Sequence, residues 1–157
     1  FSAVSWYSIC MTELDKKKIA KIMEKHGIIV GYLFGSALRG TMGPHSDIDT
    51  AVLFDARVVP KEKQFDAKLS LMGEIADACG VENADVINLP EVTDPLIKYI
   101  SVFSGEMILN KNDAKRSNLE CKIVRDYEHT RNLRKIAYTI MKRQLSDGTF
   151  GKSLTSV

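Results

Sequence analysis

Long apolar runs are missing from this sequence: no stretch of about 18 apolar residues occurs, so no membrane-spanning helix is predicted. Cysteine is also scarce. The chain has three cysteines, Cys10, Cys79 and Cys121, which is an odd number without close spacing. This pattern excludes a disulfide framework and a zinc cluster, and it indicates a reducing cytosol. The net charge is only +2, so charge by itself gives no argument for nucleic-acid binding.

Internal repeats, linkers and low-complexity blocks are absent too, and a length of 157 residues suggests one domain. We expect residues 11–145 to form it. Residues 1–10 precede Met11 and lack the charged start and long apolar core of a secretory signal, so we interpret them as a non-native or disordered leader. Residues 146–157 are expected to be a flexible tail.

Hydrophobic periodicity predicts helices that alternate with short strands. The predicted strands cover residues 28–34, 47–54, 84–89 and, at a sheet edge, 106–109. The predicted helices cover residues 12–27, 60–79, 95–104 and 113–145. This order indicates an α+β fold in which helices flank a small mixed sheet of about four strands, with a long C-terminal helix at the end.

Two of the predicted helices carry apolar stripes that we expect to face the core. The stripe of helix 60–79 consists of Phe65, Leu69, Met72, Ile75 and Ala76. The stripe of the last helix consists of Leu119, Ile123, Tyr127, Ala137, Ile140 and Met141. Residues 115–143 hold nine basic and three acidic side chains, a net charge of +6. That surface is either a solvated helix face or a contact for an acidic partner or RNA, and Tyr127 or Tyr138 could belong to a protein interface.

Two aspartates, Asp47 and Asp49, begin the predicted strand 47–54, and ten residues separate them from a Gly35-Ser36 pair. Side chains alternate along a strand, so both carboxylates share one face. Carboxylates this close repel each other unless a positive charge lies between them, and Mg²⁺ commonly takes one or two carboxylates together with substrate phosphates. A Gly-Ser turn offers backbone N–H groups and a hydroxyl to phosphate oxygens. Each feature alone is common at solvated strand ends, but the combination predicts a bound nucleoside triphosphate and metal.

The stretch "LFGSALRGTMGPHSDIDTAV" resembles the signature of the nucleotidyltransferase superfamily related to DNA polymerase β, in its minimal nucleotidyltransferase (MNT) branch. The resemblance extends from about residue 12 to residue 145. It implies the polymerase β-like nucleotidyltransferase fold and a third acidic residue on a later strand, for which Asp85 in "ADVINL" is the match. Thr50 departs from the apolar residue that many relatives have.

The resemblance also implies transfer of AMP from ATP to a hydroxyl group, with release of pyrophosphate. The implied catalytic residues and ligands of two Mg²⁺ ions are Asp47, Asp49 and Asp85. The residues implied to contact the nucleotide are Gly35, Ser36, Arg39 and Ser46. Arg39 either neutralises the leaving pyrophosphate or is a solvated loop arginine.

MNT proteins resemble the adenylyltransferase antitoxins of HEPN/MNT toxin–antitoxin systems, in which AMP is placed on a tyrosine of a HEPN-domain toxin. The resemblance therefore implies a HEPN-domain toxin as the partner of this protein, in the cytoplasm. It implies no contact with a membrane, and it does not imply nucleic acid as the direct substrate. Two alternatives stay open. The acceptor could be a small hydroxyl compound such as an aminoglycoside, or the protein could block a toxin by contact alone. Nothing in the residues selects adenine, so ATP rests on the resemblance.

Overall fold

The computed structural model describes residues 11–39 and 47–151, and its centre is one four-stranded sheet with the strand order β3-β2-β1-β4. The strands are β1 (Ile28–Phe34), β2 (Ile48–Phe54), β3 (Ala84–Asn88) and β4 (Glu106–Asn110). β1 pairs antiparallel with both β2 and β4, whereas β2 pairs parallel with β3. The predicted small mixed sheet is therefore confirmed.

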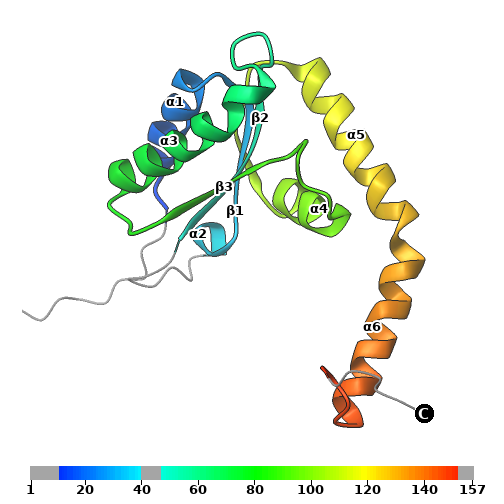
Figure 1. The fold of residues 1–157 in the computed structure, drawn as a ribbon. Helices are drawn as coiled ribbons and strands as arrows, with labels where there is room; N and C mark the ends of the chain where they lie inside the picture. The colour runs from blue at the N-terminus through cyan, green and yellow to red at the C-terminus, as the bar shows by residue number, and fades with distance from the viewer. Residues whose placement is uncertain (1–10, 40–46, 152–157) are drawn as a thin grey trace, which may run out of the picture.

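Helices cover both faces of this sheet. The helices of the described residues are α1 (Glu13–Lys25), α2 (Ser36–Arg39), α3 (Lys61–Cys79), α4 (Pro95–Phe103), α5 (Asp113–His129) and α6 (Arg131–Ser146). α1 and α3 pack side by side on one face, while α4 and α5 lie together on the other, as Figure 1 shows. Within the described part of the chain, no helix is long and apolar enough to cross a membrane. The architecture is the predicted α+β class.

Local signals in the sequence set the helix ends. Thr12 caps α1 in a capping box with Asp15, because its side chain accepts from the backbone N–H of Asp15 at 3.2 Å. Asp94 caps α4 ahead of Pro95 by accepting from the backbone N–H of Leu96 at 2.8 Å. α3 ends at Gly80, whose φ of 65° favours glycine.

The sheet separates two apolar clusters. The first lies under α1 and α3 and includes Ile19, Met23, Ile48, Val52, Leu71 and Ile75. The second lies under α4 and α5 and includes Tyr32, Ala51, Leu89, Val102 and Ile123. Successive residues of β2 alternate between them, so each face of the strand is assigned to one helix pair.

The predicted buried face of α3 is partly wrong. Leu71 and Ile75 are its fully buried residues, whereas Phe65 and Leu69 are 61% and 50% exposed. The apolar residues of this helix form two neighbouring rows along its surface, and the two rows are displaced from each other by about one residue. Packing against α1 and the sheet buries the row of Leu71 and Ile75. Phe65 and Leu69 belong to the other row.

The long helix predicted over residues 113–145 is divided in the structure into two helices, α5 and α6, that meet at Thr130. The Thr130 hydroxyl donates to backbone carbonyls of the preceding turn, those of Asp126 and Tyr127, each at 3.1 Å. Ile123 is buried as predicted, but Ile140 and Met141 are exposed. α6 runs away from the sheet instead of packing on it (Figure 1).

Candidate active site

Strand pairing brings two of the three predicted acidic residues to adjacent positions. Asp49 is the second residue of β2, and its direct partner on the parallel strand β3 is Asp85. Asp47 immediately precedes β2. Side chains at paired positions of neighbouring strands point to the same face, so Asp49 and Asp85 share one side of the sheet.

These carboxylates lie on the face that α4 covers. Ile48 belongs to the cluster under α1 and α3, and Ala51 belongs to the cluster under α4 and α5. The alternation along β2 therefore directs Asp49 to the α4 side. Val86 packs toward α1 and α3, so Asp85 is directed to the α4 side as well.

Gly35 lies directly against the carboxylate of Asp49. It follows β1 with a φ of 78°, and a Cβ built on it would lie 2.0 Å from Oδ2 and 3.0 Å from Cγ of Asp49. Only a residue without a side chain fits there, for both the backbone angle and the contact. We predicted Gly35 as a point of phosphate approach. The structure adds that its missing side chain makes room for Asp49.

The acidic residues differ in exposure. Asp47 and Asp49 are half-buried, whereas Asp85 is exposed. The Thr50 hydroxyl is buried and donates to the backbone carbonyl of Asp85 at 3.2 Å. This hydrogen bond satisfies the hydroxyl of Thr50, the residue at which this chain departs from the family pattern. It also links β2 to β3 beside the acidic residues.

The fit of this site to metal ions rests on the chemistry of its donors. Carboxylate oxygens are the ligands that Mg²⁺ prefers, and one or two of them are usually combined with waters and substrate phosphates. Across residues 11–39 and 47–151, no three His, Cys, Asp or Glu side chains converge closely enough to hold a metal ion by themselves. The donor set thus fits an ion shared with a bound triphosphate better than a site made of protein ligands alone.

The structure describes two of the four predicted nucleotide contacts, Gly35 and Ser36. Ser36 begins α2 directly after Gly35. The side chain of Arg39 and the whole of Ser46 lie outside the described residues.

Two positions near the acidic residues escaped the sequence analysis. Phe34, at the end of β1, is the antiparallel partner of Asp49 and packs in the cluster under α4. Gly105 follows α4, and a Cβ there would lie 2.3 Å from the Ser101 carbonyl oxygen and 2.9 Å from that of Leu33. Gly105 therefore lets the end of α4 approach β1 beside the site. In the sequence, the only sign of this role is that Gly105 is a single glycine between a predicted helix and a predicted strand.

Comparison with known proteins gives a consistent picture. Residues 17–114 match the family model described as "Polymerase beta, Nucleotidyltransferase", which is more than half of the chain. A comparison with curated proteins gives no match.

Solved structures share the fold. A crystal structure of a toxin–antitoxin with AMP-PNP is 22% identical with a TM-score of 0.62, covering 80% of this chain and 98% of that one. Two mutant structures of the toxin–antitoxin MntA–HpeT are also similar. One is 22% identical with a TM-score of 0.65, covering 80% of this chain and 98% of its own. The other is 25% identical with a TM-score of 0.62, covering 79% and 95%.

Proposed function

Because the chain belongs to the polymerase β nucleotidyltransferase family, we propose that it transfers AMP from ATP to a hydroxyl group of a partner protein. The observation that carries the proposal is the pairing of Asp49 with Asp85, with Gly35 fitted against the Asp49 carboxylate. This places acidic groups on one face of the sheet, next to the turn that precedes Ser36. These carboxylates and the triphosphate are both negatively charged, so they can lie close together only if cations are bound between them.

In the proposed reaction, the acceptor oxygen forms a bond to the α-phosphorus of ATP while the bond from that phosphorus to the β-phosphate oxygen breaks. Pyrophosphate leaves, and the acceptor proton passes to the carboxylate of Asp85. Asp47 and Asp49 would hold two Mg²⁺ ions together with Asp85, and these ions supply charge neutralisation on the attacking and leaving oxygens. Ser36 and the Gly35 backbone orient the β- and γ-phosphates, and Arg39 and Ser46 complete the nucleotide contacts.

The proposed acceptor is a tyrosine of a cognate HEPN-domain toxin, which the transfer would silence in the cytoplasm. Support comes from the similar solved structures, which are toxin–antitoxin proteins and include one with AMP-PNP, an analogue of ATP. The MNT signature at Gly35–Asp49 points in the same direction. The chain would then act as the antitoxin of the pair.

The test is the intact mass of the purified HEPN-domain protein after incubation with this chain, ATP and Mg²⁺. We expect a gain of one or more AMP units. Asp49→Asn keeps the shape of the side chain beside Gly35 and should abolish the gain, because the carboxylates act as one unit. Asp66→Asn is the matched control, since Asp66 is exposed on α3, which lies on the other face of the sheet.

Asp66→Asn should transfer AMP at the rate of the wild type. Transfer that survives in Asp49→Asn would exclude the assigned site. Absence of any mass gain with the wild type, while ATP still binds, would exclude a protein acceptor of this kind.

A further inference from the structure

A cavity of about 410 Å³ lies where the ends of β2 and β3 meet the start of α3. Its apolar wall includes Leu53, Phe54 and Pro90. Asp49 is the second residue of β2 and Phe54 is the last, a separation of roughly 17 Å along an extended strand. The cavity is therefore separate from the candidate active site, and its size falls within the range typical of small-molecule sites.

The position of this cavity follows from the order of the elements. β2, α3 and β3 form a unit in which a helix connects two parallel strands. The cavity lies at the carboxyl ends of both strands and at the amino end of the helix between them. Ligands commonly bind at this position in α/β sheets, because the first backbone N–H groups of the helix point toward it.

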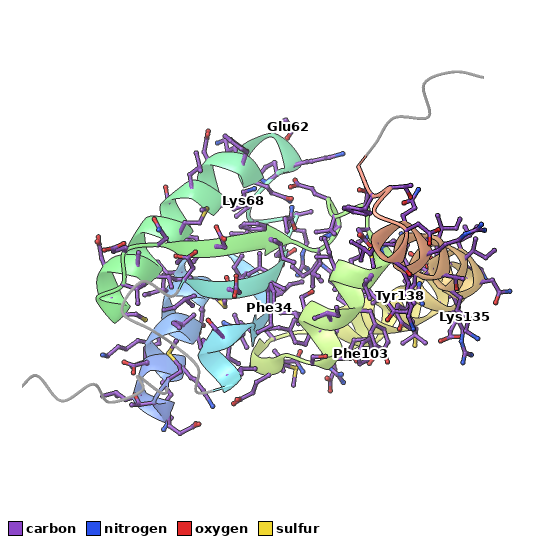
Figure 2. All side chains as sticks on the ribbon, turned by 90° about the horizontal axis from the view of Figure 1, so that it is seen from below. Phe34, Glu62, Lys68, Phe103, Lys135 and Tyr138 are labelled. Atoms are coloured by element: carbon purple, nitrogen blue, oxygen red, sulfur yellow. The ribbon has the colours of Figure 1, made fainter. Side chains whose placement is uncertain are left out.

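The start of α3 has no side-chain cap from the residues that the structure describes. Its N-cap is Pro60, whose side chain offers no acceptor. The first N–H groups of a helix favour an anion, and the ammonium group of Lys61 adds a positive charge at the cavity wall. Figure 2 shows Glu62, in the same turn, on the side of α3 away from the sheet. This end of the cavity therefore suits a negatively charged group.

A buried amide at the cavity wall lacks one hydrogen-bond partner. Asn88 ends β3 and is only 3% exposed, and its Nδ2 donates to Oε1 of Gln64 at 2.9 Å. Gln64 donates from Nε2 to the Val59 carbonyl at 3.1 Å, which fixes the orientation of both amides. Asn88 Oδ1 then accepts no hydrogen bond from any described residue. Buried acceptors are satisfied in most proteins, so this oxygen requires a donor from a bound molecule, either a ligand or a water.

The groups around the cavity define the chemistry of a ligand. Lys61 and the start of α3 favour an anionic group, whereas Asn88 Oδ1 and the nearby carboxylate of Glu91 favour a positively charged donor. The two positions are close, because Asn88 is hydrogen-bonded to Gln64 in the first turns of α3. The apolar wall suits a hydrocarbon side chain. A zwitterionic α-amino acid has all three of these groups within one small molecule.

We propose that this cavity binds a free α-amino acid with an aliphatic side chain, whose carboxylate lies at the start of α3 and whose ammonium group donates to Asn88 Oδ1. This inference goes beyond the proposed function, because it requires neither ATP nor an acceptor protein. It gives the chain a second ligand site, at the end of β2 and β3 opposite to Asp49 and Asp85.

The test titrates the isotope-labelled full chain with L-leucine and follows its amide signals by NMR. We expect saturable shifts of the Lys61 backbone amide and of the Asn88 side-chain amide. Isocaproate is leucine without the ammonium group, and isoamylamine is leucine without the carboxylate. Each should bind about tenfold more weakly than L-leucine or worse, because hydrogen bonds to a charged group are lost.

Two charge reversals in one turn of α3 test the position of the carboxylate. Lys61→Glu should weaken the binding of L-leucine about fivefold or more. Lys63→Glu is the matched control, because Lys63 is exposed in the same turn but lies on another side of the helix. It should stay within about twofold of the wild type, since exposed charges at a distance are screened. Asn88→Leu removes the acceptor and should abolish the shifts, and the same spectra report whether this variant folds.

The proposal is overturned if L-leucine causes no saturable shifts, which would leave water as the partner of Asn88. It is also overturned if isocaproate or isoamylamine binds as tightly as L-leucine, or if Lys61→Glu and Lys63→Glu weaken binding equally. Displacement of L-leucine by ATP and Mg²⁺ would place the amino acid in the candidate active site and overturn it as well. AMP transfer is not measured in this test, so a failure of the proposed function would leave its result unaffected.

Discussion

Replacing Gly35 with alanine would place a methyl carbon 2.0 Å from Oδ2 of Asp49. Side-chain carbons do not approach other atoms this closely, because real Cβ atoms essentially never show contacts under 3.0 Å. The Asp49 carboxylate therefore has to move by about 1 Å or more. Gly35 also has a φ of 78°, which adds backbone strain for any L-residue.

The two effects have different sizes and different readouts. The left-handed backbone costs about 1–2 kcal/mol of folding free energy in an alanine variant. For a chain of this length that corresponds to a fall in Tm of about 2–8 °C. A displacement of about 1 Å in a catalytic group costs roughly 100-fold in rate. We therefore expect Gly35→Ala to fold with modestly lower stability and to transfer AMP about 100-fold more slowly.

Gly80→Ala separates these effects. Gly80 ends α3 with a φ of 65°, and nothing lies within 4 Å of a Cβ built on it. It carries the same backbone strain without the contact to a carboxylate, so it should lose similar stability and keep full activity. The measurements are thermal unfolding and the initial rate of AMP transfer to the HEPN-domain protein. A Gly35→Ala protein as active as Gly80→Ala would refute the reasoning that Asp49 needs its observed position.

Two further predictions concern stability. Hydrogen bonds from Arg57, with another from Lys115, hold the pKa of the buried Asp55 carboxyl well below its usual range. Because the folded-state pKa is depressed, the ionised form stabilises the protein above the unfolded value of about 4, and this stabilisation is lost as the pH falls through the folded value. The Tm deficit of Asp55→Asn should thus be full at pH 7 and shrink toward pH 2; a constant deficit would contradict this. The Tyr32 hydroxyl, on a residue only 2% exposed, donates to Glu120 at 2.8 Å and links β1 to α5. Tyr32→Phe should lower the free energy of unfolding in urea by about 1–3 kcal/mol, and an unchanged midpoint would exclude a stabilising role for this bond.

Local signals in the sequence predicted most of the elements and part of the site. The capping box of Thr12 and the glycine at position 80 mark helix ends through bonds within a few residues, so they can be recognised without the fold. The same holds for the Gly35-Ser36 pair and the two aspartates at the start of β2, because the turn and the alternation of a strand are local properties.

The sequence predicted the buried faces of the helices less accurately than the helix ends, because the packing partner of a helix cannot be read from the helix alone. Two apolar rows of similar strength run along α3, and only contact with α1 and the sheet selects the row of Leu71 over that of Phe65. The periodicity of residues 113–145 likewise predicted one buried stripe. The break at Thr130 instead directs α6 away from the sheet, and its stripe is left exposed.

By itself, the sequence determined the order of strands and helices, the acidic motif and its family, because each depends on residues close together along the chain. The tertiary structure decided which of these residues meet. Asp85 lies next to Asp49 only because β2 and β3 pair in parallel and in this register. Gly35 lies against the Asp49 carboxylate only because β1 ends at Phe34, which pairs with Asp49. Such contacts between distant residues depend on how the whole sheet assembles, and no local pattern specifies that assembly.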